Sequence, residues 1–474
     1  MESKRVLDIF KEITAIPRES GREEPMTLWL QEWAAAHGLA CSTDKTGNVL
    51  ITREAAPGLE KAGTIVLQAH QDMVCEKNST SSHDFLHDPI KYVIKDGWMI
   101  AEETTLGADD GIGIAACLAL LEDSKPSCKV ECLFTISEET GMDGAFALEK
   151  GFFTGKTLIN LDSEDEGQLF IGCAGGIHTD VDFSYKLQDI KAGYKVLSLK
   201  IKGGIGGHSG DDINKGRANT VQEMARFLYA ELPKGMQLVS FCGGGKSNAI
   251  AREAEAVVAV PDADKTATRF AAFGKDLSVE FHVTDPGLKV EAKPISGAYK
   301  AIDDDCITKL ITSLYACPHG VFAMSQDIDG LVETSTNLAS VKTLNDGTIH
   351  VATSQRSSLT SQRDMIAAKV EANFAPTGAA ISHNNPYPGW APNVNSEILK
   401  VCVDSYRRLF NTEPEVKAIH AGLECGLFLE KFPDLDMISF GPTLRGVHAP
   451  GEKLELASMD KFVELLDDVV CNFR

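Results

Sequence analysis

Acidic and histidine side chains stand at the ends of short apolar runs in the first third of the chain. His70 and Asp72 lie two residues apart in LQAHQD, directly after the run TIVLQ. In a strand, side chains two apart point to the same side, so the carboxylate can fix the tautomer of an imidazole that binds a metal. A histidine without a ligand role gives the same pattern by chance, so the pair needs support from elsewhere.

Further carboxylates follow the same rule of position. Asp109 and Asp110 in LGADDGIG precede an apolar helical run, where a helix cap would explain one carboxylate but not both. Glu138 and Glu139 end the run LFTIS, and in an extended chain one could face a metal while the other meets a bound water. A solvated turn is the plain alternative for this pair. Asp162 follows LINL in the same relation to its run.

His448 lies in the Gly/Pro-rich stretch GPTLRGVHAPGE after the run DMISF. Alone it is typical of a histidine in a surface loop. Taken together, two histidines and four or five carboxylates at strand ends form a set of nitrogen and oxygen ligands suited to zinc or manganese. Bridging two ions would require a shared carboxylate such as Asp109.

The elements that must position these residues alternate between short strands and helices from Thr64 to Asp165. Such alternation predicts an α/β fold with a mostly parallel sheet. In open sheets of this class, ligands bind at the carboxyl ends of the strands, where these polar residues stand. The predicted position and the predicted chemistry therefore agree.

The pattern changes after about Tyr185. KVLSLKIKGG and AIAREAEAVVAV alternate like strands, ASVKTLNDGTIHVATSQ predicts two strands around an Asn-Asp-Gly turn, and KGRANTVQEMARFLYAEL and SQRDMIAAKVEANF predict helices. This is typical of a separate α+β domain. Residues 383–396 are rich in Pro, Gly and Asn and predict the return linker, after which the first pattern resumes with a helix over 396–410, the strand DMISF and a helix from Ala457.

We therefore predict a catalytic domain made of residues 1–185 and 389–474, with a second domain inserted at 186–388. The chain has 474 residues and a formal net charge of −22, which disfavours nucleic acid and anionic lipid as partners. No stretch reaches the ~18 consecutive apolar residues of a membrane span. The first residues predict a helix instead of an export signal, and twelve cysteines without a CxxC pair predict reduced thiols in the cytoplasm.

Several motifs together resemble a known family. The segments are LQAHQDMV, TTLGADDGIG, SEETGMDGAF, NLDSEDEG, CAGGI, GGHSG, HAGLECGLF and GVHAPGE, and the similarity in order and spacing runs over nearly the whole chain. They resemble the di-zinc aminoacyl-histidine dipeptidases, also called cytosolic non-specific or Xaa-His dipeptidases. These belong to the co-catalytic metallopeptidases, which include glutamate carboxypeptidase and aminoacylase.

The resemblance implies two divalent metal ions per chain, most simply Zn²⁺, with Mn²⁺ and Co²⁺ as alternatives. Asp109 would bridge the ions. His70 and Asp162 would complete one coordination shell, and Glu139 and His448 the other. A water between the ions would attack the scissile carbonyl.

In the same family pattern Glu138 would be the general base and Asp72 the carboxylate that orients the histidine ligand. The chain departs from the pattern at two places. It has Asp109-Asp110 where many relatives have Asp-Asn, and we assign the bridge to Asp109 from its register. It has HAPGE where HSPDE is usual, so we expect the ligand to be kept and the residues around it to differ.

The inserted domain resembles the family's lid and dimerisation domain, which implies a homodimer formed through it. His208 would stabilise the oxyanion, often across the dimer, and Asn248 and Arg356 would hold the carboxylate and carbonyl of the substrate. Glu424 is a candidate for contact with the substrate amine. Without the resemblance these would be a turn histidine, a residue at a strand start, a surface arginine and a structural glutamate. GGIGGHSG lacks the GKS/T ending of a phosphate loop.

The leading hypothesis is therefore a dipeptidase that cleaves unblocked dipeptides, including Xaa-His and possibly β-alanyl-histidine. An N-acyl amino-acid deacylase on the same scaffold is the second hypothesis, and a binding protein without turnover is the third. The presence of Glu138 together with all five ligand positions argues against the third.

Overall fold

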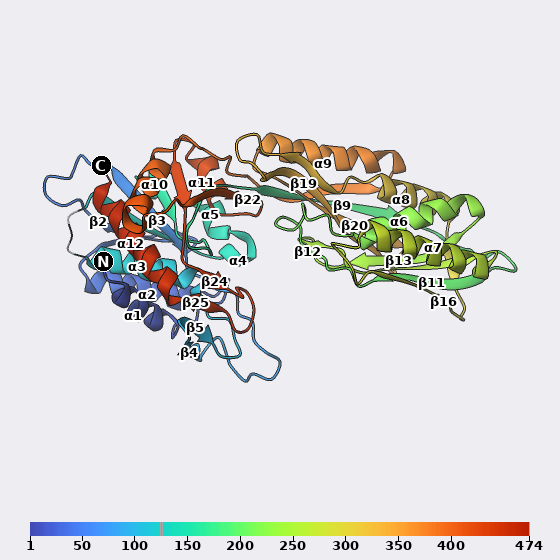
Figure 1. Ribbon diagram of the computed structural model, residues 1–474, viewed down its shortest axis with the longest axis horizontal. Helices are drawn as coiled ribbons and strands as arrows, with labels where there is room; N and C mark the ends of the chain where they lie inside the picture. The colour runs from blue at the N-terminus through green and yellow to red at the C-terminus, as the bar shows by residue number, and fades with distance from the viewer. Residues whose placement is uncertain (124, 126, 474) are drawn as a thin grey trace. The chain divides into compact units, whose positions relative to one another are not determined.

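The computed structural model describes residues 1–123, 125 and 127–473, which form two compact units (Figure 1). Unit 1 consists of Met1–Cys173, Trp390–Ala418 and Leu423–Arg474, and unit 2 of Ala174–Gly389 and Ile419–Gly422. The chain enters unit 2 before the change of sequence pattern near residue 185, because the intervening residues form a strand of the second sheet. The chain returns to unit 2 for the short segment 419–422, and the local composition does not predict this return.

The centre of unit 1 is an eight-stranded sheet with mostly parallel strands in its middle. In spatial order its strands are β1 (Ala40–Thr43), β2 (Val49–Arg53), β6 (Lys129–Thr135), β3 (Thr64–His70), β7 (Thr157–Asn160), β23 (Asp436–Ser439), β8 (Gln168–Cys173) and β22 (Glu415–Ile419). The four neighbours β6, β3, β7 and β23 are parallel, and the pairs β1–β2, β2–β6 and β23–β8 are antiparallel. The prediction of an α/β fold with a mostly parallel sheet is confirmed.

Helices pack around this sheet. They are α1 (Ser3–Ile13), α2 (Glu24–Ala36), α3 (Ala108–Glu122), α4 (Glu138–Gly141), α5 (Asp143–Ala147), α10 (Glu397–Phe410), α11 (Cys425–Lys431) and α12 (Leu456–Asn472). Each of them except the short α4 has buried residues. In α1, the four residues at helical spacing Val6, Ile9, Phe10 and Ile13 are fully buried, as an amphipathic helix requires. A small sheet joins β24 (Leu444–Arg445), β25 (Lys453–Glu455), β5 (Trp98–Ala101) and β4 (Tyr92–Lys95).

Unit 2 is built on a nine-stranded sheet in which every pair of neighbours is antiparallel. Its path is β16 (Lys289–Pro294), β11 (Lys195–Lys202), β15 (Ala254–Val260), β13 (Gln237–Gly244), β19 (Val332–Thr343), β20 (Thr348–Ser357), β9 (Gly175–Ser184) and β21 (Ala380–Tyr387), with β18 (Gly320–Met324) beside β19. The β19–β20 hairpin turns at the predicted Asn-Asp-Gly, where Gly347 has φ 90°.

The helices of unit 2 share one apolar core with this sheet. They are α6 (Thr220–Glu231), α7 (Ala263–Glu280), α8 (Asp304–Ala316) and α9 (Thr360–Phe374), with the 3₁₀ turns η1 (Leu232–Lys234) and η2 (Ala375–Thr377). Two short ladders complete the unit, one of β10 (Leu187–Asp189) and β17 (Lys300–Ile302), the other of β12 (Gly207–His208) and β14 (Ala249–Ile250). Unit 2 thus has the predicted α+β composition.

The predicted linker at 383–396 is wrong over its first residues. The chain there is the edge strand β21, which extends to Tyr387 and pairs with β9. Polar side chains support the pairing, since Asn384 donates to Asp180 at 2.9 Å. The register shifts between Asn384 and Tyr387, and such an irregular edge accommodates Pro386. Turn-forming composition alone does not distinguish an exposed edge strand from a linker.

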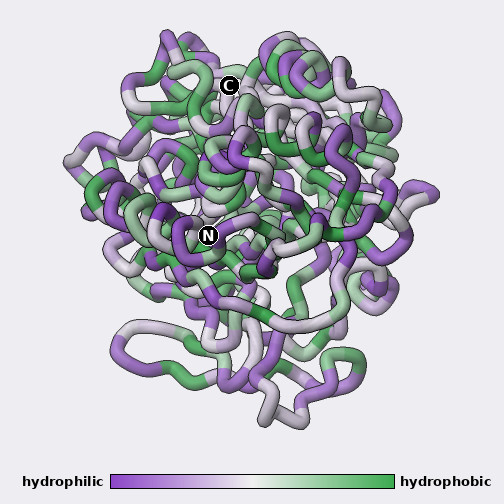
Figure 2. The backbone as a smooth tube through the Cα atoms, turned by 90° about the vertical axis from the view of Figure 1, so that its right-hand side faces the viewer, coloured by the Kyte–Doolittle hydropathy of each residue, from purple (hydrophilic) through white to green (hydrophobic). Residues whose placement is uncertain are grey.

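Hydrophobic and hydrophilic residues alternate in short stretches along the backbone (Figure 2). Within the described part of the chain, no helix is both long and apolar enough to cross a membrane.

Candidate metal centre

Five side chains that the sequence suggested as ligands meet in unit 1. His70 ends β3, Asp109 lies in the first turn of α3, Glu139 is the second residue of α4, which follows β6, Asp162 follows β7, and His448 lies in the loop after β24. Their ligand atoms form groups that lie within 4.8 Å of one another: His70 with Asp109 and Asp162, and Asp109 with Glu139 and His448. Positions that are 378 residues apart in numbering, from 70 to 448, are therefore brought to one place by the sheet.

His70 directs one ring nitrogen to two of these carboxylates and the other to its neighbour. Its Nε2 lies 2.9 Å from Oδ1 of Asp109 and 3.5 Å from Oδ1 of Asp162. Its Nδ1 lies 3.1 Å from the carbonyl oxygen of Asp72 and 3.3 Å from the Asp72 carboxylate. A proton on Nδ1 would satisfy these acceptors and leave the Nε2 lone pair free for a metal.

Asp109 contacts both histidines, each through a different oxygen. Oδ1 meets His70, and Oδ2 lies 3.2 Å from Nε2 of His448, which is also 2.9 Å from Oε1 of Glu139. The adjacent Asp110 instead accepts from the backbone N–H of His70 at 3.3 Å and of Gly113 at 3.1 Å. Of the two aspartates, Asp110 caps the start of the helix, and Asp109 has the geometry of a bridging carboxylate.

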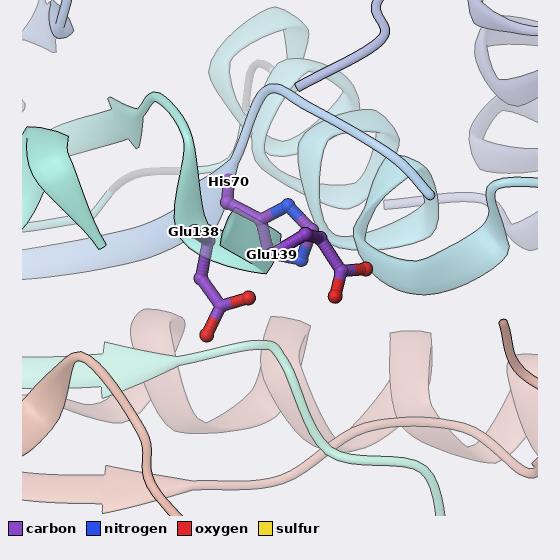
Figure 3. A group of neighbouring side chains, drawn as sticks. All are labelled: His70, Glu138 and Glu139. Atoms are coloured by element: carbon purple, nitrogen blue, oxygen red, sulfur yellow. The ribbon is translucent and has the colours of Figure 1, made fainter. Parts of the chain in front are cut away.

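Glu138 and Glu139 were expected at the end of a strand, but they form the first residues of the short helix α4. Ser137 before them has φ 53°, and this left-handed residue turns the chain out of β6. Consecutive helical side chains diverge, so the two carboxylates leave the helix in different directions beside His70 (Figure 3). Both come within ligand distance of His70, and Glu139 alone of the pair also meets His448.

Asp72 was expected to orient His70, but its carboxylate also forms hydrogen bonds with other residues of the site. Its carboxylate accepts the backbone N–H groups of Glu138 at 3.0 Å and Glu139 at 3.2 Å, and the hydroxyl of Ser20 at 2.8 Å. Burial opposes its ionisation, but the hydrogen bond and charge of His70 prevail and lower the pKa of Asp72 to about 2. It therefore acts as a fixed anion that positions the turn carrying both glutamates.

The charges in the cluster perturb one another strongly. Burial raises the pKa of Asp162 well above its ordinary value, and the charge of Asp109 raises it further. Burial likewise raises the pKa of Glu138, as does the charge of Glu139. Hydrogen bonds to Asp109 and Glu139 raise the pKa of His448 to about 11. Without cations, this group of acids retains protons that metal binding would displace.

The donor set fits the cofactor that the resemblance implies. Imidazole nitrogens and carboxylate oxygens are ligands of zinc, manganese and cobalt, and the excess of carboxylates favours cations over anions. Three groups lie within 4.8 Å, and the two that contain Asp109 share only that residue, as a pair of neighbouring ions requires. The third group joins His70 with Glu138 and Glu139. The residues present therefore suit two divalent ions.

Glu424 directly precedes α11, and it is fully buried. Its Oε2 accepts from Nε2 of Gln68 at 2.6 Å and from the hydroxyl of Thr135 at 2.7 Å. Burial raises the pKa of Glu424 to about 7. These are contacts with residues of β3 and β6, and the predicted contact with a substrate amine stays a prediction.

The other three substrate candidates belong to unit 2. His208 on β12 pairs with Ala249 of β14, and the hydrogen bond from Ser209 N–H to the Asn248 carbonyl, 2.9 Å long, places the His208 and Asn248 segments together. Arg356 on β20 is buried and donates to the hydroxyl of Tyr387 at 3.3 Å, while its Nε has no partner among the described residues.

His420 is a buried residue near these candidates that the sequence analysis missed. It belongs to the short segment of unit 2 at 419–422, and its Nε2 lies 2.7 Å from the hydroxyl of Ser335, which pairs with Arg356 across the sheet. Burial, and then the charge of Arg356, lowers the pKa of His420 to about 3. Its signal was available, because His420 begins the motif HAGLECG, from which only the glutamate was taken.

Arg18 and Glu452 were also missed. Both are buried charged residues of unit 1 that contact backbone next to the candidate ligands. Arg18 stands in a polar stretch near the start of the chain, where an arginine is usually solvated. Glu452 ends the motif HAPGE, whose histidine alone was singled out.

Comparisons with known proteins bear on the whole chain. The model of peptidase family M20/M25/M40 matches residues 66–472. The cytosol non-specific dipeptidase of Escherichia coli K12 is 37% identical over 468 residues, which cover 98% of this chain and 96% of that protein.

Comparison with solved structures also finds matches over nearly the whole chain. The aminoacylhistidine dipeptidase from Vibrio alginolyticus matches with a TM-score of 0.91 and 38% identity over 99% of this chain and 96% of that one. The aminopeptidase PepT from Bacillus cereus matches with a TM-score of 0.58 and 16% identity over 99% and 98%, a likeness of fold. The family match and the full-length relatives show that this chain belongs to peptidase family M20/M25/M40.

Proposed function

We propose that this chain is a two-metal dipeptidase that hydrolyses unblocked dipeptides. The observation that carries the proposal is the position of Asp109, whose two carboxylate oxygens face His70 and His448 separately. A carboxylate that bridges two ions directs its two oxygens at two different ligand groups in this way. The names of the relatives at 37% and 38% identity support dipeptides as the substrate class.

In this proposal Asp109 is shared between two sites. His70 and Asp162 complete one, and Glu139 and His448 the other. Bound divalent ions, most simply Zn²⁺, would supply a water of lowered pKa and polarise the scissile carbonyl. Mn²⁺ and Co²⁺ suit the same ligands.

Glu138 is the proposed general base. It takes the proton of the attacking water and delivers it to the leaving amine. Its raised pKa, caused by burial and the neighbouring Glu139, makes it a stronger proton acceptor than an ordinary carboxylate. Asp72 supports this step by holding the backbone N–H of Glu138.

Unit 2 is the proposed lid and dimerisation domain, corresponding to the predicted insertion at 186–388. His208 would donate to the oxyanion, in its own chain or across a homodimer, and Asn248 and Arg356 would hold the carboxylate end of the substrate. The buried position of Arg356, with an unpartnered Nε among the described residues, is suited to receiving an anion. Glu424 is kept as a weaker candidate for the substrate amine.

Xaa-His and other dipeptides, including β-alanyl-histidine, are the proposed substrates, and the cytoplasm is the proposed compartment. The cytosolic name of the Escherichia coli relative and a sequence of twelve cysteines without a CxxC pair support that compartment.

Metal analysis combined with a hydrolysis panel tests the proposal. We expect two ions per chain, activity lost with chelator, and preference for free dipeptides over acetylated amino acids and tripeptides. A site built for charged ends loses affinity when a charge is missing. Efficient deacylation with slow dipeptide turnover would favour a deacylase instead, and metal binding without hydrolysis of any member would indicate a binding protein.

A further inference from the structure

The backbone turn Leu106–Ala108, which leads into Asp109, is held by a buried carboxylate. Glu452 accepts the N–H groups of Leu106 at 2.7 Å, Gly107 at 3.0 Å and Ala108 at 2.8 Å. Glu452 is 2% exposed. Three successive N–H groups at the start of α3 form a favourable site for an anion, so one side chain fixes the whole turn.

Arg18 holds the same turn through its carbonyl side. Its Nη2 donates to the carbonyl of Gly107, and its Nη1 donates to the carbonyls of Gln71 at 3.1 Å and Asp72 at 2.7 Å. The side chain is 2% exposed, and these three hydrogen bonds all go to backbone carbonyls. A buried guanidinium is costly unless hydrogen-bonded, and here backbone carbonyls supply the bonds.

The turn is fitted closely to this guanidinium. Gly107 has φ 68°, and a Cβ there would overlap the Nη2 of Arg18 and lie 2.8 Å from the sulfur of Met73. A Cβ on Gly111, one helical turn later, would lie 2.7 Å from the same nitrogen. The two glycines therefore leave the space that Arg18 fills.

These contacts connect three segments that carry candidate ligands. Asp72 lies two residues after His70, Gly107 lies two residues before Asp109, and Glu452 lies four residues after His448. Arg18 joins the first segment to the second, and Glu452 joins the third to the second.

We propose that Arg18 and Glu452 are positioning residues that aim the two oxygens of Asp109 at the two metal sites, so that both ions bind tightly. This rests on the proposed two-metal function. A bridging carboxylate must satisfy two directions at once, and tolerance for such sites is about 0.5 Å. Loss of a partner outside the coordination shell typically costs ~10- to 100-fold in metal affinity.

The variants Glu452→Gln and Arg18→Met test this in the full-length chain. The measurements are Zn²⁺ affinity by competition with a chromophoric chelator and ions retained per chain. We expect affinity for the pair of ions to fall ~10- to 100-fold in each variant. Thermal unfolding of the metal-free chains separates this effect from a general loss of stability.

Two matched controls exist in unit 1. Glu131 is also 2% exposed and accepts the N–H groups of Thr154 at 2.8 Å and Gly155 at 2.9 Å, away from the ligands. Arg53 donates to the carbonyls of Leu120 and Asp123 at the far end of α3, at 2.5 and 2.8 Å. Glu131→Gln and Arg53→Met should lower metal-free stability comparably and leave metal affinity unchanged.

Unchanged metal affinity in Glu452→Gln and Arg18→Met, or losses equal to those of the controls, would overturn the positioning role. If these variants do not fold, Glu452→Asp and Arg18→Lys take their place. Metal affinity equal to that of the wild type in both of these variants would also overturn the positioning role. A wild-type chain that fails to bind two ions would contradict the proposed function instead. The two failures are therefore distinguishable.

Discussion

The two units differ in how their sheets place polar residues. In unit 1 the parallel strands β6, β3 and β7 all end at one edge, so the residues that follow them converge. In unit 2 every neighbouring pair in the large sheet is antiparallel, so consecutive strands end at opposite edges. In unit 1, polar residues that follow successive strands are therefore expected to lie close together. In unit 2 the same sequence pattern does not predict that such residues are neighbours.

The largest effect on metal content and activity should come from substitution of Asp109, which contacts both histidines of the cluster in unit 1. Asp109→Asn should lose both ions and lower activity by ~10³-fold or more, because several kcal/mol of charge stabilisation depend on the ions. Elemental analysis and dipeptide hydrolysis measure this, and exhaustive chelation of the wild type should have the same effect. Asp110→Asn is the control, since Asp110 caps the helix. Retention of two ions in Asp109→Asn would show that the bridge lies elsewhere.

Glu138→Gln should separate proton transfer from metal binding. We expect near-normal metal content and a kcat lowered by ~10²- to 10⁴-fold, since the base acts in the transition state and is not a ligand. Its neighbour is the matched comparison, because Glu139→Gln should lose metal first. Metal loss in the first variant with retention in the second would reverse the two roles.

The sequence predicted the fold of unit 1 and its cluster for the same physical reason. The run Thr64–His70 is strand β3 over its whole predicted length, and apolar runs of this kind identify buried parallel strands. The roles of the carboxylates came from the family resemblance, and the choice of Asp109 over Asp110 came from its register. Composition could not have distinguished Asp109 from Asp110, because the difference arises from how the first turn of α3 meets His70.

Other features depend on approaches between distant segments. Arg18 is buried only because residues 53, 54 and 89 positions away supply carbonyls to it. Glu452 meets N–H groups 344 to 346 positions away. Local sequence patterns do not predict these long-range contacts. A polar edge strand such as β21 is also missed, because it contains proline and asparagine.

His208→Ala tests whether unit 2 takes part in chemistry. If His208 stabilises the oxyanion, kcat should fall by ~10²-fold with a much smaller change in KM, because the interaction strengthens only as the tetrahedral intermediate forms. Metal content should stay normal. His350→Ala, which removes a histidine paired with Asp182 in the same unit, is the control. A change confined to KM would indicate a role in substrate binding alone.

Mixing inactive His208→Ala and Glu138→Gln chains tests whether His208 acts across a homodimer. Under conditions that exchange subunits, one site of a heterodimer would combine an intact Glu138 with the partner's intact His208, and activity should reappear. Heterodimers that form without activity above either parent would place His208 in its own chain.

The smallest expected effect concerns the stability of unit 2 at low pH. Burial and the charges of Arg356 and His208 lower the pKa of His420 to about 3, and the charge of Asp211 only partly opposes them. Between pH 3 and the ordinary histidine value of 6.5, the unfolded chain therefore binds a proton that the folded chain excludes. The free energy of unfolding should fall as the pH drops below 6.5, by about 1.4 kcal/mol for each further pH unit.

His420→Gln removes this titration and keeps a partner for the hydroxyl of Ser335. Urea unfolding of metal-stripped chains at pH 7.5, 6 and 5 should show the variant losing less stability than the wild type, by about 2 kcal/mol at pH 5. His87→Gln is the control, because the side chain of His87 is 74% exposed, so folding changes its surroundings little. Parallel pH profiles for wild type and His420→Gln would mean that His420 accepts a proton within the folded unit. In that case the buried surroundings of His420 would tolerate a charge, as the cluster of carboxylates in unit 1 does.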